Sequence, residues 1–349
     1  MKGRTTNIQT NRPLIIPIFI PHNGCPHRCV FCDQEGITAQ SARPMDPHGV
    51  TDILELAIRA NAFDSARHAE VAFYGGTFTG LPVDRMKQLL HAVAPYIEDH
   101  LIQSIRVSTR PDFIDPGRLR ILKSSHVHTV ELGVQSMDDR VLTMARRGHL
   151  SSDVTRAVGL LKAWGFNVGV QLMPGLPGDS RKTFQKTIDR VISLAPDMVR
   201  LYPALVIAGT GLARMYEAGT FHPLTLEEAV AWCVDSTMQL EAREIPVIRI
   251  GLMSSPTLLE AGRIVAGPWH PAFGFLVRSA IHYRVMEPEL PASGTVRRLR
   301  IFVPPKEIPL VRGHRNQGVR RIEQRTCAEV VGIEPDETVP PGRVRIEKT

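Results

Sequence analysis

Long apolar runs are missing from this sequence of 349 residues. The longest strongly apolar stretch, Leu14 to Ile20, has seven residues and includes Pro17, whereas a helix needs about 20 apolar residues to cross a bilayer. Basic residues before it imitate a secretion signal, but the apolar segment is broken and no A-x-A cleavage site follows. We therefore expect a cytoplasmic protein that does not span a membrane.

Cysteines are also scarce, with only five in the chain. So few cannot form a disulfide framework, and they suit a reducing compartment in which thiolates stay free to bind metal. The sequence has no second C-x2-C pair and no H-E-x-x-H among its 13 histidines. These absences argue against a four-thiolate zinc ribbon and against a second metal site.

The composition is that of a globular protein, with 43% hydrophobic and 22% charged residues. The length suffices for one large barrel with an appendage, or for two ordinary domains. The net charge is +7, and residues 293–349 contribute +5 of it, with 12 Lys and Arg against 7 Asp and Glu. This excess favours a polyanionic partner such as nucleic acid, and a solvated basic surface is the alternative.

Short apolar runs alternate with amphipathic segments along most of the chain. Strands are predicted at 14–20, 70–74, 104–108, 129–134, 166–173, 198–202 and 247–250, and helices at 46–60, 82–97, 115–124, 138–145, 151–164 (with a serine cap), 180–195 and 226–242. Such alternation predicts an α/β fold with a parallel sheet, with too few units for a closed eight-stranded barrel. A doubly wound sheet is the alternative, but no G-x-G-x-x-G follows the first strand.

The same patterns divide the chain into three parts. Residues 1–12 are polar and predicted to be a flexible arm. The strand–helix units place a barrel at 13–255, and a small basic α+β domain is expected at 256–349, with a helix at 272–286 and strands at 296–303 and 343–346.

Three of the cysteines lie close together, as Cys25-x3-Cys29-x2-Cys32, directly after the first predicted strand. Thiolates at this spacing select zinc or an iron–sulfur cluster. A 4Fe-4S cluster held by three cysteines leaves one iron without a protein ligand, open to a small molecule. A structural zinc site completed by His22 or His27 is the alternative.

This loop resembles that of the radical S-adenosylmethionine (SAM) superfamily, and the sequence around it resembles the radical SAM domain of the Elongator catalytic subunit. The resemblance extends to four further segments: Phe73–Gly80 (FYGGTFTG), Arg106–Asp112 (RVSTRPD), Glu131–Ser136 (ELGVQS) and Leu201–Thr210 (LYPALVIAGT). It implies a partial, splayed (β/α)6 TIM-like barrel with a small C-terminal α+β appendage. It also implies a 4Fe-4S cluster, SAM, and an external electron donor such as ferredoxin or flavodoxin.

The resemblance assigns the cluster to Cys25, Cys29 and Cys32. It assigns contacts with SAM to eight further residues: Phe31, Gly75, Gly76, Thr77, Ser108, Gln135, Arg147 and Gln171. The glycines would let backbone carbonyls approach the SAM ammonium group, and the Arg147 guanidinium would hold the methionine carboxylate. Packing, or satisfaction of backbone groups, is the simpler explanation for each polar member. Tyr202 and Arg110 could face the substrate, and no residue is assigned a catalytic role.

The resemblance implies that SAM is cleaved to a 5′-deoxyadenosyl radical, with tRNA as the leading candidate substrate. The chain resembles a short form without the acetyltransferase domain, so the acetyl-dependent reaction does not transfer. A radical SAM enzyme acting on a porphyrin-like or other small metabolite is the first alternative, because the coproporphyrinogen dehydrogenase group shares the Gly-Val-Gln-Ser and Gly-Leu-Pro elements. A non-catalytic iron–sulfur or zinc scaffold that binds RNA is the second.

Overall fold

The structure is a computed structural model that describes residues 13–26, 28–38, 45–64 and 67–348. The predicted arm at residues 1–12 lies outside the described residues, as does His27. No helix in the part of the chain that the structure describes is long and apolar enough to cross a membrane.

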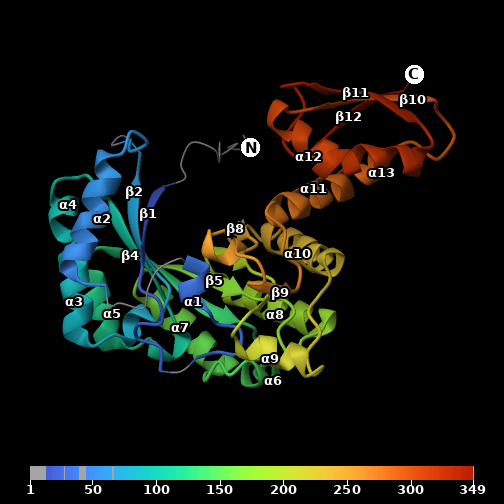
Figure 1. The fold of residues 1–349 in the computed structure, drawn as a ribbon. Helices are drawn as coiled ribbons and strands as arrows, with labels where there is room; N and C mark the ends of the chain where they lie inside the picture. The colour runs from blue at the N-terminus through green and yellow to red at the C-terminus, as the bar shows by residue number, and fades with distance from the viewer. Residues whose placement is uncertain (1–12, 27, 39–44, 65–66, 349) are drawn as a thin grey trace.

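A seven-stranded sheet forms the centre of the molecule (Figure 1). Its order is β1-β2-β3-β4-β5-β6-β8, and every neighbouring pair is parallel. The strands are β1 (Leu14–Phe19), β2 (Ala69–Tyr74), β3 (Ser104–Thr109), β4 (Val127–Gln135), β5 (Asn167–Leu172), β6 (Met198–Leu201) and β8 (Val247–Ile250). The strands β1 and β8 are the two ends of this order, so the sheet is a curled half-barrel rather than a closed barrel. The predicted α/β class is confirmed.

Helices follow the strands because apolar positions recur at helical spacing and polar residues cap the first turns. The helices of this part are α1 (Gln34–Thr38), α2 (Pro47–Arg59), α3 (Val83–His91), α4 (Ala94–Glu98), α5 (Pro116–Ser124), α6 (Asp139–Met144), α7 (Ser151–Ala163), α8 (Arg181–Leu194), α9 (Gly211–Glu217) and α10 (Leu226–Glu241). Asp46 and Asp115 accept hydrogen bonds from backbone amides of the first turns of α2 and α5, and Thr225 and Glu228 form a capping box on α10.

Two details of the helix prediction are wrong. The single helix expected at 82–97 is two helices, α3 and α4. Pro95 has no amide hydrogen, and inside one continuous helix its ring would meet the carbonyl of His91. The predicted serine cap on α7 is also absent: Ser151 is the first helical residue, and the amide of Leu150 donates to Asp153 Oδ2 at 2.9 Å.

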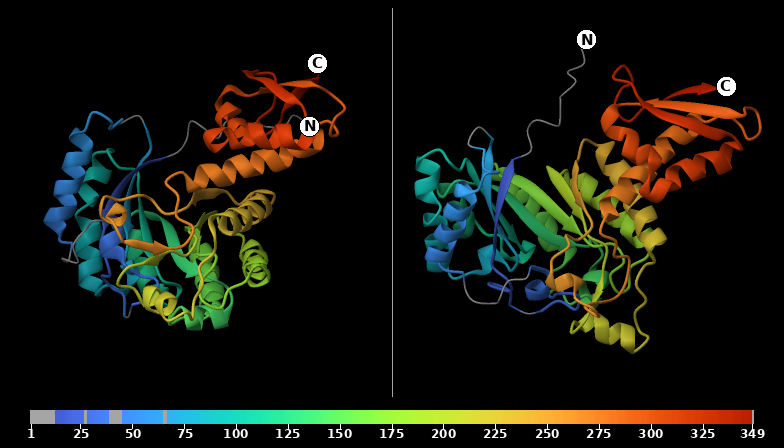
Figure 2. Two further views of the ribbon diagram at one scale, coloured as in Figure 1. Left: turned by 45° about the vertical axis from the view of Figure 1, so that its right-hand side comes forward. Right: turned by 45° about the horizontal axis from the view of Figure 1, so that its top comes forward.

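A second, smaller sheet lies at the C-terminal end of the chain, on the side from which the barrel strands begin (Figures 1 and 2). Its order is β11-β10-β12, with β10 parallel to β11 and antiparallel to β12. The elements here are α11 (Phe273–Met286), β10 (Arg298–Val303), α12 (Ile308–Arg312), α13 (Gln317–Thr326), β11 (Glu329–Pro335) and β12 (Arg345–Lys348). The predicted helix and two strands are present, and α12, α13 and β11 were not predicted.

Each sheet has its own apolar core, and α11 contributes to both. Phe273 and Val277 pack in the core of the half-barrel, whereas Tyr283 and Met286 belong to the core of the small domain. A short antiparallel pair, β7 (Val206–Ile207) and β9 (Ile264–Ala266), adds a third sheet beside the half-barrel. The domain division at residue 255 stays a prediction.

Candidate active site

A cavity of about 590 Å³ lies inside the half-barrel. Among its lining residues are nearly all the candidates from the sequence: Cys25, Cys29, Phe31, Cys32, Gly75, Gly76, Ser108, Gln135, Arg147 and Gln171, together with Tyr202 and Arg110. These residues converge because parallel strands place their carboxyl ends at one edge. Thr77 does not line the cavity; its Oγ1 lies 3.2 Å from Cys25 Sγ.

The cysteine loop is anchored on one side by backbone hydrogen bonds. The amide of Val30 donates to Ala145 O at 3.2 Å, and Val30 O accepts from the amide of Leu212 at 2.6 Å. Leu212 belongs to α9, a helix that was not predicted from the sequence. The residues between the second and third cysteines are therefore held between the end of α6 and the start of α9.

On its other side the cysteine loop packs directly against the loop after β2. The amide of Thr77 donates to Asn23 O at 2.7 Å. Gly76 has φ +56°, and a Cβ atom there would lie 2.3 Å from Asn23 O. A Cβ atom on Gly24 would lie 2.1 Å from Thr77 O. Since real Cβ atoms do not approach so closely, glycine is required at both positions.

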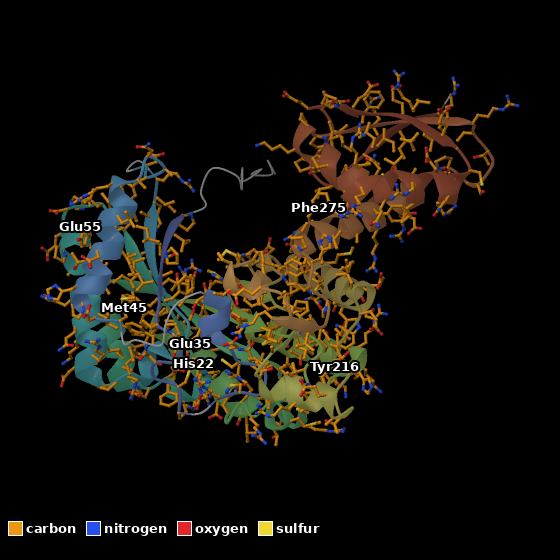
Figure 3. All side chains as sticks on the ribbon, viewed as in Figure 1. His22, Glu35, Met45, Glu55, Tyr216 and Phe275 are labelled. Atoms are coloured by element: carbon orange, nitrogen blue, oxygen red, sulfur yellow. The ribbon has the colours of Figure 1, made fainter. Side chains whose placement is uncertain are left out.

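Gln34 joins these two loops, although no motif in the sequence pointed to it. Its Oε1 accepts from the amide of His22 at 2.5 Å and from the amide of Gly76 at 2.8 Å. Figure 3 labels His22 and also Glu35, the neighbour of Gln34 in α1. One side chain therefore fixes the start of the cysteine loop relative to the glycines of β2.

Two of the three thiols, Cys25 and Cys32, lie in an environment that disfavours the charged thiolate. Burial, followed by the neighbouring Cys29 and Cys25, raises the pKa of Cys32 to about 12, and burial also raises the pKa of Cys25. A bound metal overcomes this because a coordinating thiol is deprotonated outright. Within the described residues, no three His, Cys, Asp or Glu side chains are placed to hold a single metal ion. In a 4Fe-4S site, by contrast, each cysteine binds a different iron.

Arg147 lies directly against the thiols. Its Nη1 donates to Cys29 Sγ at 3.1 Å, its Nη2 donates to Gly133 O at 2.5 Å, and its guanidinium carbon lies 5.9 Å from the centre of the Phe31 ring. A guanidinium in this place supplies positive charge beside any anionic group that the thiols hold.

Gln135 and Gln171 meet on the neighbouring strands β4 and β5. Gln171 Nε2 donates to Gln135 Oε1 at 3.2 Å. Gln135 has φ +69° and is buried, and the pairing of β4 with β5 shifts register between Gly133 and Gln135. The irregular strand end turns the Gln135 side chain into the cavity.

A chain of ion pairs joins the strands β2, β3, β4 and β6 inside the half-barrel. Arg106 pairs with Glu70 at 2.7 Å and with Glu131 at 2.5 Å, and Arg200 pairs with Glu131 at 2.7 Å. Two carboxylates thus neutralise two guanidinium groups. The sequence does show these four charged residues on strands that are predicted to be buried. Which of them form ion pairs depends on the register between the strands, and a single sequence does not give that register.

Two tyrosines extend this chain into the cavity. Arg200 Nη2 donates to Tyr74 Oη at 2.8 Å, and Arg200 Nη1 donates to Tyr202 Oη at 3.2 Å. Burial raises the pKa of Tyr74 to about 12, so its phenol keeps its hydrogen. Arg110 forms a two-bond pair with Asp112, at 2.9 and 2.8 Å.

These features define an α/β half-barrel that collects its polar and thiol side chains at the carboxyl ends of parallel strands, as enzymes of the barrel class do. Residues 19–191 match the profile of the radical SAM superfamily, and residues 196–283 match that of the Radical_SAM C-terminal domain. The chain belongs to the radical SAM superfamily.

Several known proteins are similar to this chain. A tRNA uridine(34) acetyltransferase of Methanocaldococcus infernus is 30% identical over 243 residues, which are 59% of this chain and 46% of that protein. An uncharacterized protein of Methanocaldococcus jannaschii is 27% identical over 289 residues, 80% of this chain and 85% of that one. The chain thus spans about half the length of the first of these relatives.

Among solved structures, an archaeal Elp3 of Methanocaldococcus infernus superposes with a TM-score of 0.60. The match has 24% sequence identity and covers 80% of this chain and 63% of that one. This likeness concerns the fold.

Proposed function

We propose that this radical SAM enzyme binds a 4Fe-4S cluster through Cys25, Cys29 and Cys32 and cleaves SAM beside it. The convergence of the three thiols with Arg147 at one end of a single cavity is the observation that supports this most directly. The cofactors would supply the reactive species, a 5′-deoxyadenosyl radical formed from SAM with one electron from a donor such as ferredoxin or flavodoxin.

The residues around the thiols fit SAM. Gly75 and Gly76 present backbone to the cavity without side chains, where carbonyl oxygens can accept from an ammonium group. Arg147 would hold the carboxylate, and Phe31 would pack on the adenine. Ser108, Gln135 and Gln171 would bind the ribose or the methionine part. Thr77, which does not line the cavity, would act indirectly by positioning Cys25 and the backbone of the cysteine loop.

We further propose that the substrate is RNA, with tRNA the leading candidate. Two of the relatives are tRNA uridine(34) acetyltransferases, and this chain covers 46% and 47% of them, so their reaction itself is not carried over. The support from this chain is the distribution of charge in the small C-terminal domain.

Arginines of the small sheet are paired with carboxylates. Arg298 pairs with Glu329 at 3.2 Å, Arg300 with Glu334 at 3.3 Å, and Arg345 with both Asp336 at 2.9 Å and Glu347 at 2.6 Å. The sheet therefore offers little net charge to a polyanion.

The helical layer of this domain is different. α12 and α13 lie together on one side of the small sheet (Figure 1). Arg312 of α12, Arg320 of α13 and Arg315 between the two helices are exposed, and no carboxylate of the described residues lies within ion-pair distance of them. Arg321 stacks on the Tyr283 ring, with its guanidinium carbon 3.8 Å from the ring centre. We call Arg312, Arg315 and Arg320 the basic helical layer; exposed arginines without carboxylate partners suit phosphate contacts.

Anaerobic reconstitution with iron and sulfide tests the proposed chemistry. The wild-type protein should bind about four irons per chain and, with a strong reductant, convert SAM to 5′-deoxyadenosine and methionine. Replacing Cys25, Cys29 and Cys32 together by Ala should abolish both properties, whereas Cys327→Ala, on an exposed cysteine outside the cavity, should abolish neither. Stoichiometric zinc without iron uptake would contradict the proposal.

The same assay separates the candidate substrates. Unmodified tRNA should accelerate SAM cleavage, whereas an anionic porphyrin should not. Acceleration by the porphyrin alone would favour a small-metabolite enzyme, and RNA binding without any SAM cleavage would favour a non-catalytic scaffold.

A further inference from the structure

Part of the cavity wall is formed by the two edge strands of the half-barrel, and we call this part the edge-strand end. Ile15, Pro17 and Phe19 of β1 line it on one side, and Arg249 of β8 lines it on the other. Since β1 and β8 are not paired with each other, this end lies between the open edges of the sheet.

Arg249 lies next to another arginine. It is the register partner of Arg200 on β6, and both side chains line the cavity. Like charges directly opposite on neighbouring strands destabilise a sheet. Anionic groups near the two guanidinium groups would offset this repulsion.

The available carboxylates compensate only one of the two. Glu131 binds Arg200 at 2.7 Å and also Arg106, whose other partner is Glu70. Among the other carboxylates of the cavity region, Asp112 pairs with Arg110 and Asp33 with Arg263. Within the described residues no carboxylate lies within ion-pair distance of Arg249, so this end of the cavity has one surplus positive charge.

Two tyrosines of the cavity wall contact Arg200, the register partner of Arg249. Tyr74 and Tyr202 each accept a hydrogen bond from Arg200 through the phenol oxygen. Each phenol hydrogen is therefore left to donate elsewhere. A guanidinium and two phenol hydrogens form a donor set suited to an anionic group with several oxygen atoms.

We propose that Arg249, assisted by Tyr202 and Tyr74, binds a phosphate or carboxylate group of the substrate. The proposal deepens the proposed function, because it takes the cavity with the three thiols as the reaction site. The partly buried apolar side chains of Ile15, Phe19 and Leu252 would reduce the amount of water around the bound anion, which would strengthen its attraction to Arg249. The anion would hold the substrate at the open side of the barrel while its reacting part points toward the thiols.

Binding of small probes to the reconstituted protein tests this inference. The probes are uridine 5′-monophosphate for a phosphate, succinate for a carboxylate, and uridine as the neutral comparison, each measured by calorimetric titration and by the shift in thermal unfolding temperature. At least one charged probe should bind and raise the unfolding temperature more than uridine does, since a ligand of the folded state stabilises it. The charged probe that binds more tightly shows whether the anionic group of the substrate is a phosphate or a carboxylate.

Three variants assign the effect to the residue. Arg249→Gln should weaken binding of the charged probe by about tenfold or more, as expected for the removal of a charge-assisted bond, and Arg249→Lys should retain part of the affinity. Arg243→Gln removes the same charge from an exposed position outside the cavity and should leave binding unchanged.

Unliganded stability gives a second readout. Arg249→Gln without probe should unfold at the same temperature as wild-type or higher, because it removes a like-charge neighbour of Arg200; an arginine with a purely structural role would lower it. Equal probe binding by wild-type and Arg249→Gln, or no preference of wild-type for either charged probe over uridine, would overturn the inference. SAM cleavage by wild-type protein without probe reports on the proposed function separately.

Discussion

Arg147 touches the thiol of Cys29 and also lines the cavity of the proposed SAM site. Arg147→Ala removes the guanidinium from Cys29 Sγ and from Gly133 O. We expect SAM affinity to fall by about 1–3 kcal/mol, the usual value of a charge-assisted hydrogen bond. The cluster potential should also fall, because hydrogen bonds to the sulfurs help to set it.

Equilibrium dialysis with SAM and a redox titration measure the two effects of Arg147→Ala. Arg140→Ala, on an exposed arginine of α6, is the matched control. An unchanged SAM affinity together with an unchanged potential would remove Arg147 from the site.

His149, two residues further on, makes stability depend on pH. Its side chain is buried, and burial, followed by the charge of Arg147, lowers its pKa from 6.5 to about 4. Between these two pH values the unfolded chain binds more protons than the folded one. Stability is therefore complete above pH 6.5 and is lost as the pH falls toward 4, by up to about 3 kcal/mol.

Urea unfolding between pH 7 and 4.5 measures this contribution. The loss of stability with falling pH should be smaller in His149→Gln than in wild-type, while His48→Gln, on an exposed histidine, should follow wild-type. Parallel profiles for His149→Gln and wild-type would show that His149 is protonated equally in both states.

At the scale of elements, the contact between the cysteine loop and the loop after β2 depends on Gly76. Gly76→Ala combines a strained φ with a Cβ atom 2.3 Å from Asn23 O. Gly219→Ala has a similar φ, +68°, but no atom within 4 Å of the new Cβ, so it isolates the backbone cost. That cost should be about 1 kcal/mol.

We expect Gly76→Ala to lose more stability than Gly219→Ala and also to bind less iron after reconstitution, because it displaces the cysteine loop. Iron content and urea unfolding of the two variants, side by side, decide this. Equal iron content in both would mean that the two loops adjust independently.

The same elements show what the sequence could predict. Strands and helices of the half-barrel were recognised because their apolar periodicity and caps are local, and the cavity residues converged because motifs at strand ends share one edge. α12 and α13 were missed because their segment is rich in arginine and buries few residues, among them Val311 and Ile322. The pairing of Glu131 with both Arg106 and Arg200, and the position of Arg249 in the cavity wall, depend on register between distant strands, which one sequence does not contain.

At the scale of the whole molecule, the half-barrel contains the proposed reaction site, and residues 293–349 contribute +5 of the net charge of +7. Replacing the basic helical layer, Arg312, Arg315 and Arg320, by Gln should weaken RNA binding and flatten its dependence on salt. The log–log slope should change by about 0.7 for each phosphate of a single strand that the protein no longer neutralises.

The sheet arginines of the small domain offer a control of equal charge. Arg298, Arg300 and Arg345, each replaced by Gln, remove the same number of charges from ion-paired positions. Filter binding of tRNA over a range of salt concentrations compares the two triple variants. Equal slopes would indicate a general effect of net charge and no role for the helical layer.

An open barrel exposes a strand edge, which is a template for aggregation by strand addition from another molecule. In β1 the amides of Leu14 and Ile20 donate toward the β2 side, and residues 15, 17 and 19 of the alternating ladder face the free edge. Pro17 is the middle one of these three, and it has no amide hydrogen to offer. A strand added to this edge would therefore lack a backbone donor at the centre of the six residues of β1. Pro17 thus disfavours polymerisation along the free edge of β1.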